Sequence, residues 1–233
     1  MGLIDLQDTL KRPMDFMFPG VHWFLEIIVL LILVLFLWNC ICTRSVRYFW
    51  KFPVPVFMGR AVAGPHRKRM QPPSMLIEAL ELTSGMKVLE LGCGPGTFTT
   101  DVARAIHPDG LVYAVDIQEG MLDQLRSRMA KEGLENIIPV LADAEGTIPL
   151  EANSMDAAFS VAVLPEIPNP VNAIVQVKRI LVKGGKFADS EFVFDPDFPL
   201  RRTVTKWAMK AGLEPVAQYG NAFRYVLVFI KRE

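Results

Sequence analysis

Hydrophobic and polar positions follow two different patterns along this chain. Near the N-terminus, residues 23–42 form an almost continuous apolar run, WFLEIIVLLILVLFLWNCIC, in which the only charged residue is Glu26. About 20 apolar residues are enough for a helix to cross the roughly 30 Å hydrocarbon layer of a bilayer. The run therefore predicts one transmembrane helix at residues 23–42. A cleaved signal peptide and a buried core helix are the alternatives, although a core helix of this length would normally keep a polar face.

Positive charge is distributed unevenly around the apolar run. Lys11 and Arg12 precede it, whereas basic residues follow it at positions 44, 47, 51, 60, 67, 68 and 69. The positive-inside tendency of membrane proteins then places the C-terminal part of the chain in the cytoplasm. The prolines of FPVPVF discourage a continuous helix after the run. We therefore expect the linker at residues 43–71 to lie along the membrane surface.

From residue 72 onward, short apolar strands alternate with segments of helical spacing. Strict alternation of buried-type strands with helices predicts a doubly wound, mostly parallel α/β sheet. The strands expected at 213–220 and 223–232 are joined by a short link, so they should pair as an antiparallel hairpin. The helix NPVNAIVQVKRIL is expected to end in a turn at Gly184-Gly185 before the fifth strand, KFADSEF. The chain thus divides into segments 1–22 (unassigned), 23–42, 43–71 and 72–233.

Composition and charge exclude several classes of function. Lys plus Arg and Asp plus Glu number 25 each, so the net charge gives no case for a nucleic-acid partner. The three cysteines have no zinc-site spacing and do not form a disulfide framework. The sequence therefore predicts neither a nucleic-acid partner nor a bound metal, and it leaves the oligomeric state open.

A glycine-rich loop directly follows the first strand of this domain. In VLELGCGPGTFT, residues 88–99, the spacing is G-x-G-x-G at Gly92, Gly94 and Gly96. The loop lacks the Gly-Lys-Ser/Thr of ATP-binding loops and differs from the G-x-G-x-x-G of NAD-binding folds. It suits a ligand that presents a methionine group, because backbone amides can receive the carboxylate and Glu90 offers negative charge near the cationic end.

Two further acids end the next two strands. Asp116 closes the second strand, where a carboxylate can accept hydrogen bonds from both hydroxyls of a ribose. Asp143 closes the third strand, where it could accept the amino group of an adenine. Ligands of open α/β sheets bind at the carboxyl ends of the strands, which is where both acids are expected.

With these motifs together, the chain resembles the class I S-adenosylmethionine-dependent methyltransferases. The similarity covers about residues 72–231, through VLELGCGPGTFT, VYAVDIQEGML, VLADAE, MDAAFSVAVLPEIPNP and RILVKGGKF. The chain is most similar to the ubiquinone/menaquinone-biosynthesis and phospholipid methyltransferase branch. The resemblance implies a Rossmann-like seven-stranded sheet and S-adenosylmethionine as cofactor.

The resemblance also implies roles for individual residues at the site. The methionine part would be held by Gly92, Cys93, Gly94 and Gly96, the ribose by Asp116, and the adenine by Ile117, Asp143 and the amide of Ala144, with Val161 under the cofactor. Many relatives carry histidine where this chain has Pro165, so the side chain facing the acceptor can differ here. Glu166 and Glu191 are the acid/base candidates, and Tyr219 is a candidate for lining the acceptor pocket.

These expectations define a membrane-anchored methyltransferase with a lipophilic acceptor. A tether raises the local concentration of the enzyme at the bilayer, which favours a quinone-precursor ring or a phospholipid headgroup as acceptor. The alternatives are methylation of small lipophilic thiols or phenols, and a non-catalytic membrane scaffold that binds the cofactor. Little chain is available after the fifth strand to form a large lid, so the membrane is expected to cover part of the pocket.

Overall fold

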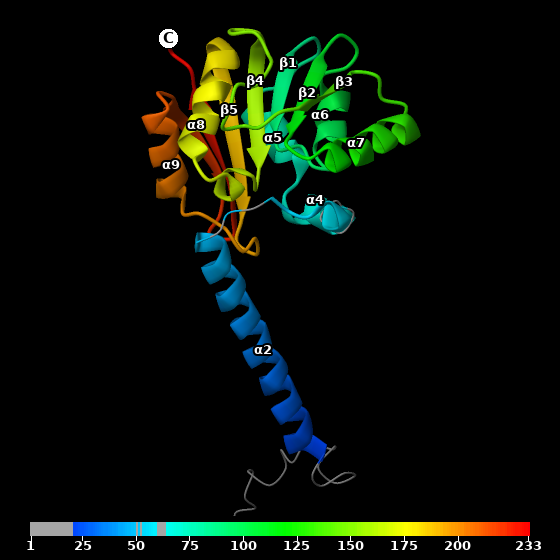
Figure 1. Cartoon of the computed structure of the whole chain (residues 1–233), viewed down its shortest axis with the longest axis vertical. Helices are drawn as coiled ribbons and strands as arrows, with labels where there is room; N and C mark the ends of the chain where they lie inside the picture. Colours follow the sequence, from blue (N-terminus) through cyan, green and yellow to red (C-terminus); the bar gives the residue numbers. More distant parts are fainter. Residues whose placement is uncertain (1–20, 50, 52, 60–63) are drawn as a thin grey trace, which may run out of the picture. The chain divides into compact units, whose positions relative to one another are not determined.

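The computed structural model of the protein describes residues 21–49, 51, 53–59 and 64–233 (Figure 1). It divides the chain into two compact units, residues 1–46 and 47–233. Most of the predicted N-terminal segment at 1–22, including Lys11 and Arg12, lies outside the described residues.

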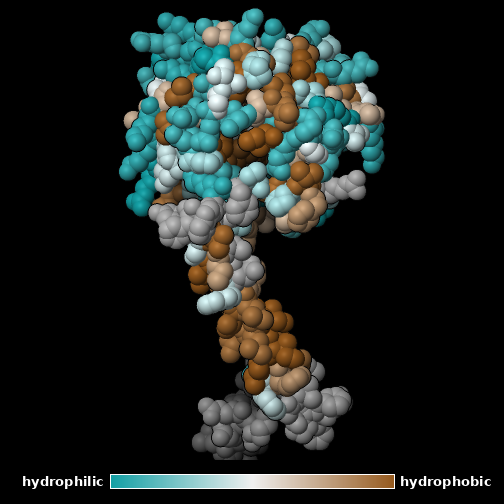
Figure 2. Space-filling view, in the orientation of Figure 1, coloured by the Kyte–Doolittle hydropathy of each residue, from teal (hydrophilic) through white to brown (hydrophobic). Residues whose placement is uncertain are grey.

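The first unit contains one long helix, α2 (Val21–Phe49), which extends beyond both ends of the predicted apolar helix at 23–42. Its large apolar side chains from Trp23 to Trp38 are exposed, except that of Ile28, and Figure 2 shows them as a brown surface along the helix. In the described part of the chain, no helix combines the length and the apolar composition needed to cross a bilayer. The helix is therefore confirmed, whereas its transmembrane character is not supported.

The second unit is built on one seven-stranded sheet with the strand order β3-β2-β1-β4-β5-β7-β6. The first five strands run parallel, and β7 is antiparallel to both β5 and β6. The predicted doubly wound sheet and its terminal hairpin are thus confirmed. The strands are β1 (Lys87–Leu91), β2 (Leu111–Asp116), β3 (Ile137–Leu141), β4 (Met155–Val161), β5 (Leu181–Phe192), β6 (Glu214–Gly220) and β7 (Arg224–Ile230).

Helices cover both faces of this sheet because successive strand residues point to opposite sides. In β1, Val88 packs into the core under α5, α6 and α7, whereas Leu89 packs into the core under α8 and α9. These helices are α5 (Pro73–Ala79), α6 (Thr99–Ala105), α7 (Glu119–Glu132), α8 (Pro170–Ile180) and α9 (Arg201–Lys210). The parallel strands between the two layers all end at one edge of the sheet, and the acids that follow them meet there.

One boundary differs from the prediction at the start of β5. The strand begins at Leu181, directly after α8, and Gly184-Gly185 lies inside it instead of in a preceding turn. The pairing with β4 shifts from Met155 opposite Leu181 to Ala157 opposite Lys186, so the glycines form a bulge. Gly184 has a positive φ of 82°, and its amide donates to the carbonyl of Lys231 over 2.7 Å.

The predicted linker at residues 43–71 is not one continuous loop. Helix α2 continues to Phe49, a short 3₁₀ turn, η2, spans Val56–Met58, and α4 spans Pro65–Met70. Residues 51 and 53–59, here called the strap, pack against the sheet unit, as described below. The expectation that this stretch lies along a membrane surface stays a prediction.

Candidate functional site

A cavity of about 720 Å³ lies at the carboxyl ends of β1, β2, β4 and β5. This volume is within the range of ligand pockets, about 300–1,000 Å³. Nine of the ten residues predicted to hold the cofactor line it: Glu90, Gly92, Cys93, Gly94, Asp116, Ile117, Asp143, Ala144 and Val161. The structure thus brings nine of the ten predicted positions together around one cavity.

Gly96 is the exception, because it serves packing and does not line the cavity. It has a φ of 79°, and a Cβ atom there would lie 2.4 Å from the Leu125 side chain of α7. Gly94 also has a positive φ, 52°, but nothing lies within 4 Å of the place of its Cβ atom. Gly94 thus leaves an open cradle in the cavity wall, while Gly96 lets α7 approach the loop.

The Asp116 carboxylate fixes the shape of this loop. Its Oδ2 accepts a hydrogen bond from the amide of Gly94 over 2.8 Å, and its Oδ1 accepts one from the amide of Gln118 over 2.9 Å. Burial raises the pKa of Asp116, and the hydrogen bonds from the backbone amides of Gln118, Gly94 and Ile117 oppose this shift. Each carboxylate oxygen can accept a further hydrogen bond, so Asp116 keeps capacity for the hydroxyls of a ribose.

Glu90 is buried at the end of β1 and receives a hydrogen bond from the hydroxyl of Thr99 in α6. Burial raises its pKa to about 8, and the nearby carboxylates of Asp116 and Asp101 act in the same direction, while the bond from Thr99 opposes it. The group is therefore mostly protonated at neutral pH when no cation is near. A cationic ligand in the cavity would favour the carboxylate form.

The adenine side of the predicted site lies after β2 and β3. Asp143 is exposed, lines the cavity, and its Oδ1 accepts the amide of Glu145 over 2.9 Å. Ile117 also lines the cavity, with 54% of its surface exposed, so it presents an apolar face to a ligand. An open carboxylate beside an exposed apolar side chain can bind an adenine, which has a polar edge and an apolar face.

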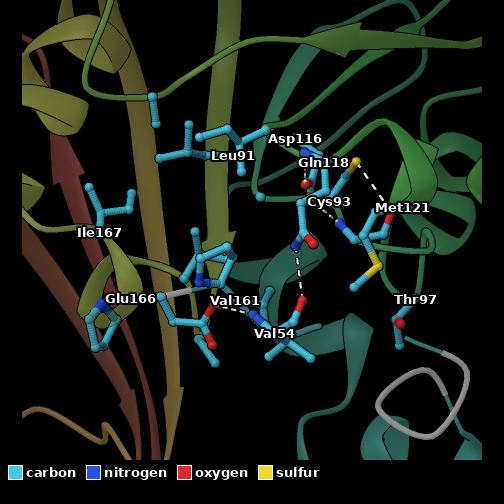
Figure 3. Close-up of a pocket in the computed structure, with 18 of the residues that line it drawn as sticks. Val54, Leu91, Cys93, Thr97, Asp116, Gln118, Met121, Val161, Glu166 and Ile167 are labelled. Atoms are coloured by element: carbon cyan, nitrogen blue, oxygen red, sulfur yellow. Dashed lines mark hydrogen bonds between the residues drawn. The ribbon is translucent and has the colours of Figure 1, made fainter. Parts of the chain in front are cut away.

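The strap crosses the cavity between α7 and the 3₁₀ turn η3 (Leu164–Glu166). The amide of Val54 donates to Oε2 of Glu166 over 3.3 Å, and the side-chain amide of Gln118 donates to the carbonyl of Val54 over 2.9 Å. Figure 3 shows Val54 between these two side chains, joined to each by a dashed line. Glu166, predicted as an acid/base candidate, therefore binds the strap through one of its carboxylate oxygens.

Further contacts hold the strap at both of its ends. Lys51 Nζ donates to the carbonyl of Ile167 over 3.0 Å and lies 5.7 Å from the centre of the Trp207 ring. At the other end, the side-chain amide of Gln124 donates to the carbonyl of Val56 over 2.9 Å. The strap also lines the cavity with the apolar residues Pro53, Val54, Pro55 and Met58. The chain itself therefore supplies the cover that was expected from the membrane.

The two remaining catalytic candidates have different positions. Glu191, near the end of β5, lines the cavity, is fully buried, and has no hydrogen-bond partner for either carboxylate oxygen among the described residues. Tyr219 lies on the edge strand β6 opposite Val226, is 46% exposed, and is not among the residues that line the cavity. Because β7 separates β6 from β5, the structure does not bring Tyr219 to the site.

The strap contacts were not predicted from the sequence. In the sequence, these contacts are indicated only by the prolines around Val54 and by the glycine at position 120. Glycine has no side chain, so another segment can approach it closely. A Cβ atom on Gly120 would lie 2.8 Å from a methyl group of Val56. A glycine on the first turn of a helix, facing the cavity side, is the kind of position that can receive another segment.

Comparisons with known proteins place this site in a family. Residues 82–227 match the family model described as a methyltransferase domain. The aklanonic acid methyltransferase DauC of Streptomyces sp. (strain C5) is 32% identical over 119 residues, which cover 51% of this chain and 54% of that protein. The ubiquinone/menaquinone biosynthesis C-methyltransferase UbiE of Saccharophagus degradans is 27% identical over 159 residues, 66% of this chain and 64% of that protein.

The fold is also similar to that of a solved structure. A SAM-dependent methyltransferase from Aquifex aeolicus has a TM-score of 0.72 at 21% sequence identity, covering 76% of this chain and 99% of that one. At this identity the likeness concerns the fold alone. The alignments cover 39% to 55% of the length of the first three curated relatives, so this chain spans about half of each.

The residues of the cavity fit S-adenosylmethionine. The open cradle at Gly94 can receive the methionine part, Asp116 has free acceptor capacity for the ribose, and Ile117 and Asp143 present an apolar face and a carboxylate to the adenine. Glu90 supplies a carboxyl group whose ionised form suits a cationic ligand.

We expect the binding of S-adenosylmethionine to release a proton from Glu90. Because the pKa of Glu90 is about 8 in the empty site and a cationic ligand favours the carboxylate, affinity should rise with pH between pH 6 and pH 8. The limiting slope is about tenfold per pH unit for one released proton. Calorimetry in buffers of different ionisation enthalpy measures the number of protons released.

The Glu90→Gln variant is the control, because its amide keeps the size of the side chain and cannot ionise. At a pH low enough that the ligand's amino group stays protonated in both proteins, the difference in proton release between wild type and variant reports Glu90. An equal proton release by the two proteins would contradict the role of Glu90.

We expect Gly120→Ala to displace the strap. Alanine in a helix is intrinsically more favourable than glycine, by about 1 kcal/mol, so the substitution alone should stabilise α7. Its Cβ atom would however lie 2.8 Å and 3.2 Å from the two methyl groups of Val56. The variant should therefore be cleaved faster by trypsin after Lys51 and should bind S-adenosylmethionine more weakly.

The double variant Gly120→Ala/Val56→Ala removes both methyl groups, so it should restore slow cleavage and cofactor affinity. Mass spectrometry of the tryptic fragments and calorimetry give both readouts. If the single variant behaves like wild type, the strap does not rest on α7 in solution.

Proposed function

The chain belongs to the methyltransferase domain family and carries the fold and site of an S-adenosylmethionine-dependent methyltransferase, and from this premise we propose that it methylates a lipophilic acceptor at a membrane. The observation that carries the proposal is the strap. It lines the cavity with apolar residues and begins two residues after the exposed apolar helix α2 ends at Phe49. An apolar acceptor would find a matching surface in the strap.

The names of similar proteins support an acceptor of this kind. Relatives include the ubiquinone/menaquinone enzyme UbiE and a demethylmenaquinone methyltransferase of Lactococcus lactis, which is 28% identical over 103 residues. DauC is named for aklanonic acid. A small lipophilic acceptor that is free in solution is therefore the second candidate. We propose a quinone-precursor ring or a phospholipid headgroup as the acceptor of this chain.

We further propose that α2 attaches the enzyme to the lipid bilayer. An exposed, contiguous apolar surface is costly in water, and in soluble proteins large patches of this kind mark sites of interaction. The side chains from Trp23 to Trp38 form such a surface, and the basic residues after it would favour the cytoplasmic side. The methyltransferase unit would then lie at the cytoplasmic face of that bilayer.

The protein contributes to the reaction mainly by positioning the cofactor and the acceptor. Bound S-adenosylmethionine supplies an activated methyl group, so the enzyme gains most by holding an acceptor in line with it. The glycine loop and Asp116 would orient the cofactor, and the strap would exclude water from the cavity. A base is needed only where the attacking atom of the acceptor carries a proton of high pKa.

We expect the full-length protein to sediment with membranes and to resist extraction with sodium carbonate. Replacing Leu30, Leu33 and Leu37 by lysine puts charges on the apolar surface of α2, at a cost of several kcal/mol for insertion into lipid. This variant should appear in the supernatant with its cofactor affinity intact. Recovery of the wild-type protein in the supernatant would contradict the attachment.

We expect labelled methyl groups to enter the organic phase when the full-length protein is incubated with methyl-labelled S-adenosylmethionine and a total lipid extract from its source. Mass analysis of that phase separates quinone from phospholipid products. Asp116→Ala is the control, because it should lose cofactor binding and labelling together. Label found only in added water-soluble metabolites would contradict the lipophilic acceptor, and no transfer despite cofactor binding would favour a scaffold.

A further inference from the structure

Two buried carboxyl groups lie on one face of β5 at the edge of the cavity. Asp189 and Glu191 are two residues apart in the strand, so they project to the same side of the sheet, and both are 0% exposed. Asp189 Oδ1 accepts the hydroxyl of Ser160 over 2.7 Å. Its Oδ2 and both oxygens of Glu191 have no hydrogen-bond partner among the described residues. Buried polar groups are normally paired, and of these two residues Glu191 lines the cavity, so its two unpaired oxygens call for a ligand there.

The charged groups around Glu191 are mostly acids. Asp189 on its own strand, Asp195 after the strand and Glu166 in η3 all raise its pKa, while Arg67 in α4 lowers it. Arg67 is itself engaged by Asp195 through two hydrogen bonds of 2.7 Å and 2.9 Å. On β7, Tyr225 faces the same group, and its hydroxyl donates to the carbonyl of Pro199 over 2.8 Å. The surroundings of Glu191 therefore favour the arrival of a positive charge.

We propose that Glu191 is a catalytic residue that binds the ammonium group of a lipophilic amine acceptor and takes a proton from its nitrogen before methyl transfer. This inference rests on the proposed function and narrows its substrate class to amines. Glu191 lines the same cavity as the cofactor residues and the apolar strap, so an amine with an apolar tail can reach it.

The protonation of Glu191 discriminates between acceptor classes. Burial, reinforced by Asp189 and Asp195, raises the pKa of Glu191 well above its usual range, so the empty site favours the neutral carboxyl. Towards a phenol or a quinol, a neutral carboxyl can donate or accept a hydrogen bond, but it is too weak a base to take the hydroxyl proton from the attacking oxygen. An ammonium ion instead stabilises the carboxylate, and the raised pKa then makes this carboxylate an effective base.

The reaction balances without any further reactant. Binding of the ammonium form releases the proton of Glu191 to solvent and leaves a carboxylate beside R–NH3⁺. Glu191 then takes one proton from the nitrogen, and the freed electron pair attacks the methyl carbon. The N–C bond forms as the C–S bond breaks, and the electron pair of that bond stays on sulfur. The products are R–NH2–CH3⁺, neutral S-adenosylhomocysteine and Glu191 again as the neutral carboxyl, so the cycle releases one proton to solvent, the one that left Glu191 when the ammonium ion bound.

The test uses full-length protein with methyl-labelled S-adenosylmethionine and phosphatidylcholine vesicles that contain either dodecylamine or 4-dodecylphenol. The two probes have the same tail and differ in the attacking group. A third set of vesicles contains phosphatidylethanolamine, which separates a headgroup amine from a free lipophilic amine. We expect label in at least one of the two amines and none in the phenol.

The variant Glu191→Gln should lower amine methylation by about 10²-fold or more, the usual contribution of a general base, while the affinity for S-adenosylmethionine stays within about twofold. At saturating S-adenosylmethionine the wild-type rate should rise with pH as Glu191 ionises, and this rise should be weaker in the variant. Glu191→Asp, which keeps the carboxyl, should recover part of the rate. Glu214→Gln, which removes an exposed partner of Arg232, is the matched control and should leave the rate unchanged.

Three results would overturn the inference: labelling of the phenol without either amine, an unchanged amine rate in Glu191→Gln with cofactor affinity intact, or no label in any probe. If the probes stay unlabelled but a total lipid extract is labelled, the amine assignment fails and the proposed function stands. If the extract is unlabelled as well, although S-adenosylmethionine binds, the proposed function fails with it.

Discussion

The carboxylate of Asp116 holds three segments of the site together. It accepts hydrogen bonds from the amides of Gly94 and Gln118, and the side chain of Gln118 in turn holds the carbonyl of Val54. The glycine loop, the start of α7 and the strap are thus connected through one buried acid at the end of β2. Because the hydrogen bonds of buried polar groups are costly to leave unmade, this group sets the shape of the loop before any ligand arrives.

The strap and the hydrogen bonds around Asp116 join the two ends of the cavity. Towards α6 and α7 lie the glycine loop and Glu90, which suit a cofactor. Beyond the strap lie Glu166 and the buried Glu191 of β5, which suit an acceptor. The strap touches both halves, through Gln118 on one side and Glu166 on the other.

Sequence periodicity predicted the sheet because its central strands are buried, and the places of Glu90, Asp116 and Asp143 near the ends of β1, β2 and β3 predicted where these acids meet. The start of β5 was misplaced, because Gly184-Gly185 forms a bulge whose pairing with β4 no local pattern reveals. The strap was missed for a similar reason. Val54 and Glu166 are 112 residues apart, and their contact depends on the complete fold. Gly96 belongs to the glycine motif predicted to hold the cofactor, but it packs against Leu125 of α7 and does not line the cavity.

The position of β7 makes the sheet around Glu191 dependent on a segment that is synthesised after the other six strands. This strand follows β5 and β6 in the sequence but lies between them, and its Tyr225 stands opposite Glu191. A ribosome delivers the other six strands first, so until β7 emerges β5 has an open edge and β6 has no neighbour in the sheet. A nascent chain can thus form the cofactor half early, whereas its acceptor half is assembled last. Truncated translation products would accordingly be inactive.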